Sequence, residues 1–360
     1  MRYYNQKVEK SPLTFPLFEI QYTSMEVNKK FKPDSSLKLM DQVRQVLRYH
    51  HYAYRTEETY CSWIVQYLRF FNFKKHPKEM GKNEIELFLS HLAVHRSVSA
   101  ATQKQALNAI IFLYKNVLDI NIDEKISPIK SRKLKKPPVV MTKQEVIRIL
   151  SYLEGNNLIM AQLLYGCGLR LMECVRLRIK DIDFGINKIY IYASKGGKNR
   201  VVQFPKTIVP YIHSQVEKVK QLHENDLAKG YGSVYIPPGL ERKYRGAAKE
   251  FIWQYLFPSK NIATDPRSGV KRRHHIQESG LQKAIKTASK KAAIHKQVTS
   301  HTFRHSFATH MLEDGVNIRV VQELMGHADV KTTEIYTHVM EKDLDAVKSP
   351  LDTLQNLEKT

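Results

Sequence analysis

The chain has 360 residues, 58 of them Lys or Arg and 35 Asp or Glu, so its formal net charge is +23 at pH 7. Its 42% of hydrophobic residues can bury real cores, which excludes a disordered polycation, and no stretch approaches the ~18 apolar residues of a membrane span. Three cysteines and the absence of an apolar N-terminal run favour a reducing cytoplasm, which leaves a folded, basic protein whose expected partner is a polyanion.

The N-terminal third of the chain predicts a small helical domain. Residues 1–36 show no clear hydrophobic period, and we expect an extension that is partly disordered. From residue 37 on, apolar residues recur at helical spacing, and Ser99 is placed as the N-cap of a helix that carries Leu107, Ile110 and Ile111. These patterns predict three or four amphipathic helices in a domain over residues 37–126.

A basic linker is predicted over residues 127–139. The run Lys130–Lys136 ends at two prolines, so it has little to bury and cannot continue a helix. Two interpretations stay open, a solvated connector and a strap along a phosphate backbone. The net charge of the chain favours the strap, whose cations would include Lys133, Lys135 and Lys136.

The second domain, residues 140–345, is predicted to be mainly helical with one hairpin. Thr142 and Glu145 are spaced as a helix-capping pair, and a helix over 157–165 should end at Gly166-Cys-Gly168. Two β-rich runs, 188–192 and 200–204, flank a Gly-Gly pair, which is typical of a β-hairpin. From there to the end the periodicity is mainly helical.

Four segments of this domain concentrate reactive side chains. They are Gly168-Leu-Arg170-x-x-Glu173, Lys195 in the hairpin, His301-x-x-Arg304, and Gly326-His327 with Tyr336 nine residues later. Taken singly, each has a structural interpretation as a salt bridge, a surface lysine, a buried histidine or a core tyrosine. Arg170 and Glu173 are three apart and therefore share a helical face.

Together, these residue types are the ones needed to transfer a phosphodiester without a metal ion. Two guanidiniums can hold non-bridging oxygens, a tyrosine can be the covalent nucleophile, and a lysine and a histidine can move protons. The sequence has no His-Glu-x-x-His motif and no paired Cys-x-x-Cys motif, and its acidic residues are too sparse for a two-metal site. We therefore expect no metal cofactor.

In this order and spacing the motifs resemble the tyrosine recombinase family, which includes phage integrases and Xer-type recombinases. The resemblance covers roughly residues 37–345. It implies a mainly α fold, with a four-helix, SAM-like core-binding domain and an α+β catalytic domain that holds a small antiparallel sheet. It further implies a C-shaped DNA clamp, a homotetramer on DNA that works through Holliday junctions, and a cytoplasmic bacterial enzyme that uses neither ATP nor metal.

The resemblance also assigns roles to the motif residues. Arg170, Arg304 and His327 would bind the scissile phosphate, and Glu173 would orient the site. Lys195 would be the general acid for the leaving 5′ oxygen, and His301 would assist proton transfer. Tyr336 would form the 3′-phosphotyrosine link.

One long segment narrows the resemblance to integron integrases. Lys243-Tyr244 and Trp253-Gln-Tyr-Leu-Phe257-Pro-Ser259 are similar to the extra helical insertion of that subfamily, here at about residues 225–260. Its members recombine gene cassettes at single-strand hairpins with extruded bases. Trp253 could stack on such bases while Arg272 and Arg273 hold the backbone; alternatively, Phe251, Trp253 and Phe257 are core residues of the inserted helix.

Other interpretations stay open beside the integron one. A Xer- or phage-type recombinase confined to duplex sites, and a non-catalytic DNA-binding regulator that has kept the fold, both fit much of the pattern. Residues 346–360 would be a tail or a helix packed on a neighbouring protomer. Cys167 and Cys174 are expected to be small buried packing residues, and no membrane contact is expected.

Overall fold

The computed structural model describes residues 31–122, 126–131, 138–192 and 199–337, in two units that divide between Lys135 and Lys136. The division falls inside the predicted linker 127–139. The linker cations Lys133, Lys135 and Lys136, the hairpin Lys195 and the C-terminal segment 346–360 all lie outside the described residues. None of the described helices is long and apolar enough to cross a bilayer.

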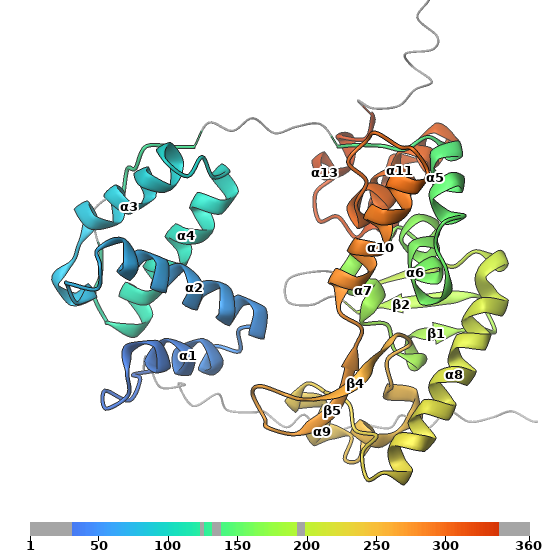
Figure 1. The fold of residues 1–360 in the computed structure, drawn as a ribbon, viewed down its shortest axis with the longest axis horizontal. Helices are drawn as coiled ribbons and strands as arrows, with labels where there is room; N and C mark the ends of the chain where they lie inside the picture. Colours follow the sequence, from blue (N-terminus) through green and yellow to red (C-terminus); the bar gives the residue numbers. More distant parts are fainter. Residues whose placement is uncertain (1–30, 123–125, 132–137, 193–198, 338–360) are drawn as a thin grey trace, which may run out of the picture. The chain divides into compact units, whose positions relative to one another are not determined.

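The described residues of the first unit form a helical bundle, as predicted (Figure 1). Its α-helices are α1 (Leu39–Tyr49), α2 (Tyr54–Phe70), α3 (Lys82–Val94) and α4 (Ala100–Phe112), and α4 continues into a π-helical turn at Leu113–Val117. Ser99 is the N-cap of α4, because its side chain accepts the backbone N–H of Thr102, which confirms that prediction. At the centre, the hydroxyls of the buried Tyr67 and Tyr114 lie 3.0 Å apart and satisfy each other.

The second unit begins with three helices and a small sheet. Helices α5 (Lys143–Leu150), α6 (Gly155–Gly166) and α7 (Leu171–Val175) precede the strands β1 (Ile182–Asp183), β2 (Lys188–Ile191) and β3 (Arg200–Gln203). The sheet is antiparallel in the order β1-β2-β3, with Ile189 opposite Val202. The Thr142 cap of α5 and the β2–β3 pairing confirm the predictions, whereas β1 was not foreseen.

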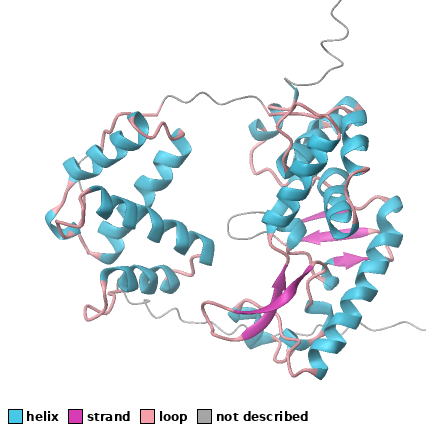
Figure 2. Ribbon diagram, in the orientation of Figure 1, coloured by secondary structure: helices cyan, strands magenta, loops and turns pink. Residues whose placement is uncertain are grey.

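Apart from loops, the remaining described residues of the second unit form helices and a second, two-stranded antiparallel sheet (Figure 2). The elements are α8 (Val209–Ala228), α9 (Pro238–Lys243), β4 (Pro258–Thr264), β5 (Lys271–His275), α10 (Glu278–Lys291), α11 (Ser300–Glu313), α12 (Ile318–Met325) and α13 (Lys331–Glu334). Thr299 caps α11 by accepting the backbone N–H of Thr302. Helix α11 packs on α6, so the motif helices lie on the main core.

The expectation of helical structure from residue 205 to the end is wrong over residues 258–275, which form β4 and β5. These strands carry mostly polar residues, so they lack the apolar alternation that marks a strand. Asp265 makes the turn between them, since its side chain accepts the backbone N–H groups of Arg267 and Ser268 at 2.9 and 3.1 Å. Within residues 225–260 only the end of α8 and the short α9 are α-helical, and Phe251–Trp253 is a single 3-10 turn.

Candidate active site

Two glycines shape the backbone beneath the charged residues of the candidate site. Gly168 follows α6, as predicted, and Gly326 ends α12; both have positive φ, +60° and +61°. A Cβ atom at Gly168 would lie 2.5 Å from the ring of Phe307, and one at Gly326 would lie 3.1 Å from the Arg200 side chain. Both positions therefore need glycine for conformation and for space.

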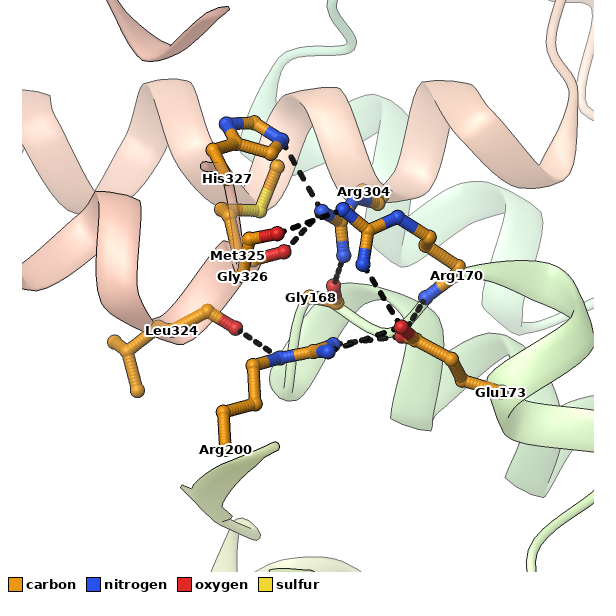
Figure 3. Close-up of polar contacts among 9 residues, drawn as sticks. All are labelled: Gly168, Arg170, Glu173, Arg200, Arg304, Leu324, Met325, Gly326 and His327. Carbon is orange, nitrogen blue, oxygen red and sulfur yellow. Dashed lines mark hydrogen bonds and ion pairs between the residues drawn. The ribbon is translucent and has the colours of Figure 1, made fainter. Parts of the chain in front are cut away.

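Glu173 lies at the centre of the charged cluster (Figure 3). Its carboxylate accepts the backbone N–H of Arg170 and also the Arg170 Nη1, both at 2.8 Å. The Nη2 of Arg170 donates to the carbonyl of Gly326 at 3.0 Å. The predicted Arg170–Glu173 pair is thus confirmed, and it joins the start of α7 to the end of α12.

Arg200 was not identified from the sequence, yet it is the main partner of Glu173. Its Nη1 and Nη2 donate to the two carboxylate oxygens at 2.9 and 2.6 Å, and its Nε donates to the carbonyl of Leu324 at 2.7 Å. The Arg200 side chain is only 6% exposed. Burial by itself would raise the pKa of Glu173, but hydrogen bonds and charge from Arg200, and then from Arg170, lower it to about 2.

Arg304 is the buried cation of the site, 4% exposed. Its Nη1 donates to the carbonyl of Gly168 and its Nη2 to the carbonyl of Met325. Burial, followed by the charge of Arg170, lowers the pKa of Arg304 to about 9, so the guanidinium is still charged at neutral pH. An anion bound beside Arg304 would favour the charged guanidinium, and so would oppose the lowering of its pKa by burial and by Arg170.

His327 lies between Arg304 and Thr333. Arg304 Nη2 donates to His327 Nε2 at 3.2 Å, so the ring proton is on Nδ1, which donates to the Thr333 hydroxyl at 2.9 Å. Burial and then the Arg304 charge lower the pKa of His327 to about 4, which keeps the ring neutral at pH 7. A phosphate beside Nε2 would favour protonation there and make His327 a donor.

Tyr336 follows α13 and is only 2% exposed. Its ring stacks on that of His327, with centroids 6.3 Å apart. Its hydroxyl lies 2.9 Å from Nδ1 of His305, a residue that was not singled out from the sequence. Burial raises the pKa of Tyr336, and the charges of Arg304 and Arg170 act in the opposite direction.

The cluster carries excess positive charge, since three guanidiniums (Arg170, Arg200 and Arg304) face one carboxylate, and 3 − 1 leaves +2. Arg170 is the accessible cation, with a side chain 42% exposed. Such a site is suited to an anion with several acceptor oxygens, such as a phosphodiester. Among the described residues, no group of three His, Cys, Asp or Glu side chains is placed to hold a metal ion.

His301 is exposed on α11, one turn before His305, and their ring centroids lie 6.3 Å apart. The described residues include no hydrogen-bond partner for His301. Burial of part of the ring, then the charges of Arg304 and Arg170, lower the pKa of His301. The structure thus brings Arg170, Glu173, Arg304, His327 and Tyr336 together, with His301 near them.

The two arginines predicted to grip DNA are engaged within the chain. Arg273 Nε and Nη2 donate to the two carboxylate oxygens of Asp226 at 2.6 and 2.7 Å. Arg272 is buried, and its Nε lies 4.0 Å from Asp265. Neither guanidinium could bind a phosphate strongly without giving up its partner, because both sit in low-dielectric surroundings.

Trp253 belongs to a surface group of cations and aromatic rings, here called the aromatic cluster: Arg178, Lys180, Tyr192, Tyr244 and Trp253. Lys180 Nζ lies 4.5 Å from the ring centroid of Tyr192 and 4.7 Å from that of Trp253. Tyr192 is 59% exposed, and the Tyr244 and Trp253 centroids are 6.1 Å apart. Trp253 is partly buried and packs on a small apolar core, which agrees in part with the core interpretation, whereas its stacking on bases stays a prediction.

Phe257 is fully buried, as the core interpretation predicted, although not in a helix. Cys167 and Cys174 are also buried free thiols, which confirms their assignment as packing residues. Burial raises the pKa of Cys167 to about 12. These residues pack the core beneath the site and are not reactive groups.

Comparison with known proteins places the chain in a family. The phage integrase family matches residues 139–343, and the SAM-like N-terminal domain of phage integrases matches residues 39–124. A protein described as "Integrase/recombinase" from Escherichia coli is 44% identical over 328 residues, 90% of this chain and 96% of that protein. The tyrosine recombinase XerA of Pyrococcus horikoshii is 30% identical over 243 residues, 67% of this chain and 71% of its own length.

Solved structures share the fold at lower identity. The Tn1549 transposon integrase, in complex with transposon right end DNA, has a TM-score of 0.54 at 16% identity and covers 90% of this chain and 99% of its own. A lambda integrase dimer bound to a core site has a TM-score of 0.53 at 15% identity and covers 83% and 93%. The chain belongs to the phage integrase family, and it is a tyrosine site-specific recombinase with a mainly helical fold, a SAM-like N-terminal domain and a small antiparallel sheet.

Proposed function

We propose that the chain cuts and rejoins DNA through a 3′-phosphotyrosine at Tyr336. The observation that carries this proposal is the position of the Tyr336 ring, stacked on His327, which itself contacts Arg304. Arg170, Arg304 and His327 would bind the scissile phosphate and stabilise the charge of the pentavalent transition state. Glu173, held by Arg200, would keep Arg170 in place.

In the proposed reaction the Tyr336 oxygen forms a bond to phosphorus while the bond from phosphorus to the 5′ oxygen breaks. Lys195 would give that oxygen its proton, and His301 would assist proton transfer at the tyrosine. The bond energy is kept in the phosphotyrosine link, so rejoining is the same step in reverse and needs no ATP.

The test of this chemistry is the variant Tyr336→Phe. It removes the hydroxyl and leaves the buried ring, so DNA binding should survive in a gel-shift assay. Covalent protein–DNA adducts, resolved by denaturing gel electrophoresis, should be lost. Adducts that persist in Tyr336→Phe would show that another residue is the nucleophile, and wild-type protein that forms none would favour a non-catalytic regulator.

For the substrate, we propose gene-cassette sites folded as single-strand hairpins, the substrates of integron integrases. The support is the aromatic cluster, where Tyr192 and Tyr244 are exposed and Lys180 stands over two rings. Aromatic faces stack on extruded bases at about 1–3 kcal/mol each, and a nearby cation can hold the backbone without reading sequence. This surface, together with the motif over residues 243–259 that resembles the integron-integrase insertion, favours hairpin sites over duplex sites as the proposed substrate.

A panel of cassette-type hairpins with and without bulged bases, next to matched duplexes, tests this substrate. The proposal expects adducts on bulged hairpins to exceed those on plain hairpins and duplexes by at least tenfold. Equal reaction on all three would support the alternative, a Xer- or phage-type enzyme on duplex DNA.

The proposal extends to assembly. Four copies would bind two sites and exchange strands through a Holliday junction, with each copy clamping DNA between its two domains. The predicted linker cations Lys133, Lys135 and Lys136 would lie along the backbone, and residues 346–360 would pack on a neighbouring copy. Mass measurement of the complex with two hairpins, by light scattering, should give four protein chains.

A further inference from the structure

The imidazole of His305 contacts the atom that the proposed reaction uses as its nucleophile. His305 lies on α11 directly after Arg304, and its Nδ1 is 2.9 Å from the Tyr336 hydroxyl. The two rings are tilted by 47° with centroids 5.5 Å apart, so they touch without stacking. The contact joins α11 to the segment after α13, 31 residues later in the chain.

The surroundings favour a neutral imidazole in the free protein. Burial, then the charges of His301 and Arg304, lower the pKa of His305 to about 4. A neutral ring whose proton is on Nε2 offers the Nδ1 lone pair to the tyrosine O–H. His327 is turned differently, because its Nδ1 donates to Thr333 and its Nε2 accepts from Arg304. Of these two rings, only His305 contacts the Tyr336 oxygen.

We propose that His305 is a catalytic residue that accepts the proton of Tyr336 as the tyrosine attacks the phosphate; this rests on Tyr336 being the nucleophile. The bond from the Tyr336 oxygen to phosphorus forms, the O–H proton moves to Nδ1 of His305, and the bond to the 5′ oxygen breaks. On rejoining, the 5′ oxygen forms its bond to phosphorus and gives its proton back to the group that had protonated it, the bond from the Tyr336 oxygen to phosphorus breaks, and Nδ1 returns the proton to that oxygen.

A bound phosphate would raise the pKa of His305, which is low in the free protein. Its negative charge would lie among Arg170 and Arg304, and it would cancel the Arg304 charge that disfavours an imidazolium at His305. His305 would thus become a better base when the substrate is in place. In this scheme His301, exposed and one turn away, aids the transfer from the solvent side and does not contact the tyrosine oxygen.

The chain contains a matched control for His305. His310, on the same helix, also places its Nδ1 at hydrogen-bond distance, 2.8 Å, from a tyrosine hydroxyl, that of Tyr165. This second pair joins α6 to α11, and the charged groups that act on His310 are Glu313, Lys143 and Asp314, not the arginines of the charged cluster. Replacing His310 removes the same kind of buried bond without touching Tyr336.

The experiment measures single-turnover adduct formation on the bulged hairpin from the panel that gives the most Tyr336-dependent adduct. Variants are His305→Ala, His305→Asn and His310→Asn. Loss of a proton acceptor costs about 10²–10⁴-fold in rate. We expect both His305 variants to fall by at least 10²-fold, hairpin binding to stay within threefold, and His310→Asn to keep the wild-type rate. His305→Asn keeps an acceptor oxygen near the Nδ1 position but cannot take a proton, so it separates proton transfer from orientation.

A second substrate, with sulfur as the bridging 5′ atom, removes the need for an acid at the leaving group. If the His305 variants are slow because they cannot accept the tyrosine proton, their rate of adduct formation must stay low on this substrate. Recovery of the rate of His305→Asn on this substrate would overturn the proposal in favour of an acid role at the leaving group, and a wild-type rate of His305→Asn on the ordinary substrate would overturn it in favour of orientation alone. Faster reaction in His305→Ala would overturn it in favour of a clamp that restrains Tyr336, and an unchanged rate would remove His305 from the reaction. If Tyr336→Phe still forms adducts, the proposed nucleophile is wrong, which is a separate result.

Discussion

The second unit holds two groups of cations that differ in what their partners leave exposed. In the candidate active site Arg200 and Arg170 share the carboxylate of Glu173, and Arg304 donates to two backbone carbonyls. In the aromatic cluster, Lys180 pairs with Asp181 at 3.1 Å and also lies over the faces of Tyr192 and Trp253, and Tyr192 is largely exposed.

The difference corresponds to two kinds of task. Stabilising one phosphate in a transition state requires donors that do not have to reorganise, and buried ion pairs supply that rigidity. Stacking on bases of varying identity requires exposed flat faces and a cation that can move with the backbone. Substitutions in the first group should therefore change reaction rate and folding, and those in the second should change which DNA is bound.

The largest expected effect is that of Arg304→Lys on cleavage. Lysine keeps the charge but cannot donate to Gly168, Met325 and His327 in the fork geometry of a guanidinium. Adduct formation should fall by about 10²–10³-fold, as for loss of one transition-state donor, while hairpin binding changes little. Arg319→Lys, at an exposed position of α12, is the control and should react at the wild-type rate.

Glu173→Gln tests whether the rigidity of the site depends on its one carboxylate. It leaves the buried Arg200 without a counter-charge, so the free energy of unfolding should fall by about 3 kcal/mol in urea titrations. The double variant Glu173→Leu with Arg200→Met removes both charges and should regain most of that loss. A single variant as stable as the wild type would mean that the carboxylate does not hold the cluster.

The loss of stability in Glu173→Gln should depend on pH. Because the pKa of Glu173 is about 2 in the folded protein and 4.5 is its ordinary value, the unfolded chain takes up the proton first as the pH falls. The stabilisation is therefore complete above pH 4.5 and is lost between 4.5 and about 2. The stability difference between wild type and Glu173→Gln should shrink over that window and stay constant above it, as measured by urea titration at each pH.

The sequence predicted which residues gather in the candidate active site but not what holds them in place. Arg170 and Glu173 could be paired from the sequence because two residues three positions apart lie on the same face of a helix. Arg200 is 27 residues beyond Glu173 and reaches it only after β3 packs beside α12, so the local pattern shows just a charged residue in a strand. A signal that Glu173 needs a second partner did exist. A buried glutamate that pairs with one arginine still has acceptor lone pairs that require further donors.

In the fold, too, local features were predicted from the sequence and features that depend on tertiary contacts were missed. Helix caps at Ser99 and Thr142 depend on neighbours three residues away, and both were predicted. Strands β4 and β5 were missed because their polar sequence gives no period, and their stability depends on tertiary pairs such as Arg273 with Asp226. His305 was missed because its partner Tyr336 is on a separate element.

In the aromatic cluster, Trp253→Leu should weaken DNA binding selectively. Leucine can still pack on the small apolar core under Trp253, but it offers no flat face for a base. Loss of one stacked base costs about 1–3 kcal/mol, so bulged hairpins should bind about tenfold more weakly while plain hairpins bind as before. Fluorescence anisotropy measures both, with Tyr211→Ala, an exposed tyrosine on α8, as control. An equal loss on both hairpins would contradict base stacking by Trp253.

The smallest expected effect is that of Lys180→Met. Lys180 contributes an ion pair to Asp181 at 3.1 Å and two cation–π contacts, each of the latter worth roughly 0.5–1 kcal/mol at a partly exposed site. Bulged and plain hairpins should both bind a few-fold more weakly, and the log–log dependence of affinity on salt should become shallower by about 0.7, since one phosphate contact is lost. Lys143→Met also removes a lysine that pairs with an aspartate, Asp314 at 2.8 Å, but outside the aromatic cluster, so it is the control and should leave the slope unchanged. An unchanged slope in Lys180→Met would mean that this lysine only supports the rings, and the aromatic cluster would then contact bases without holding the backbone.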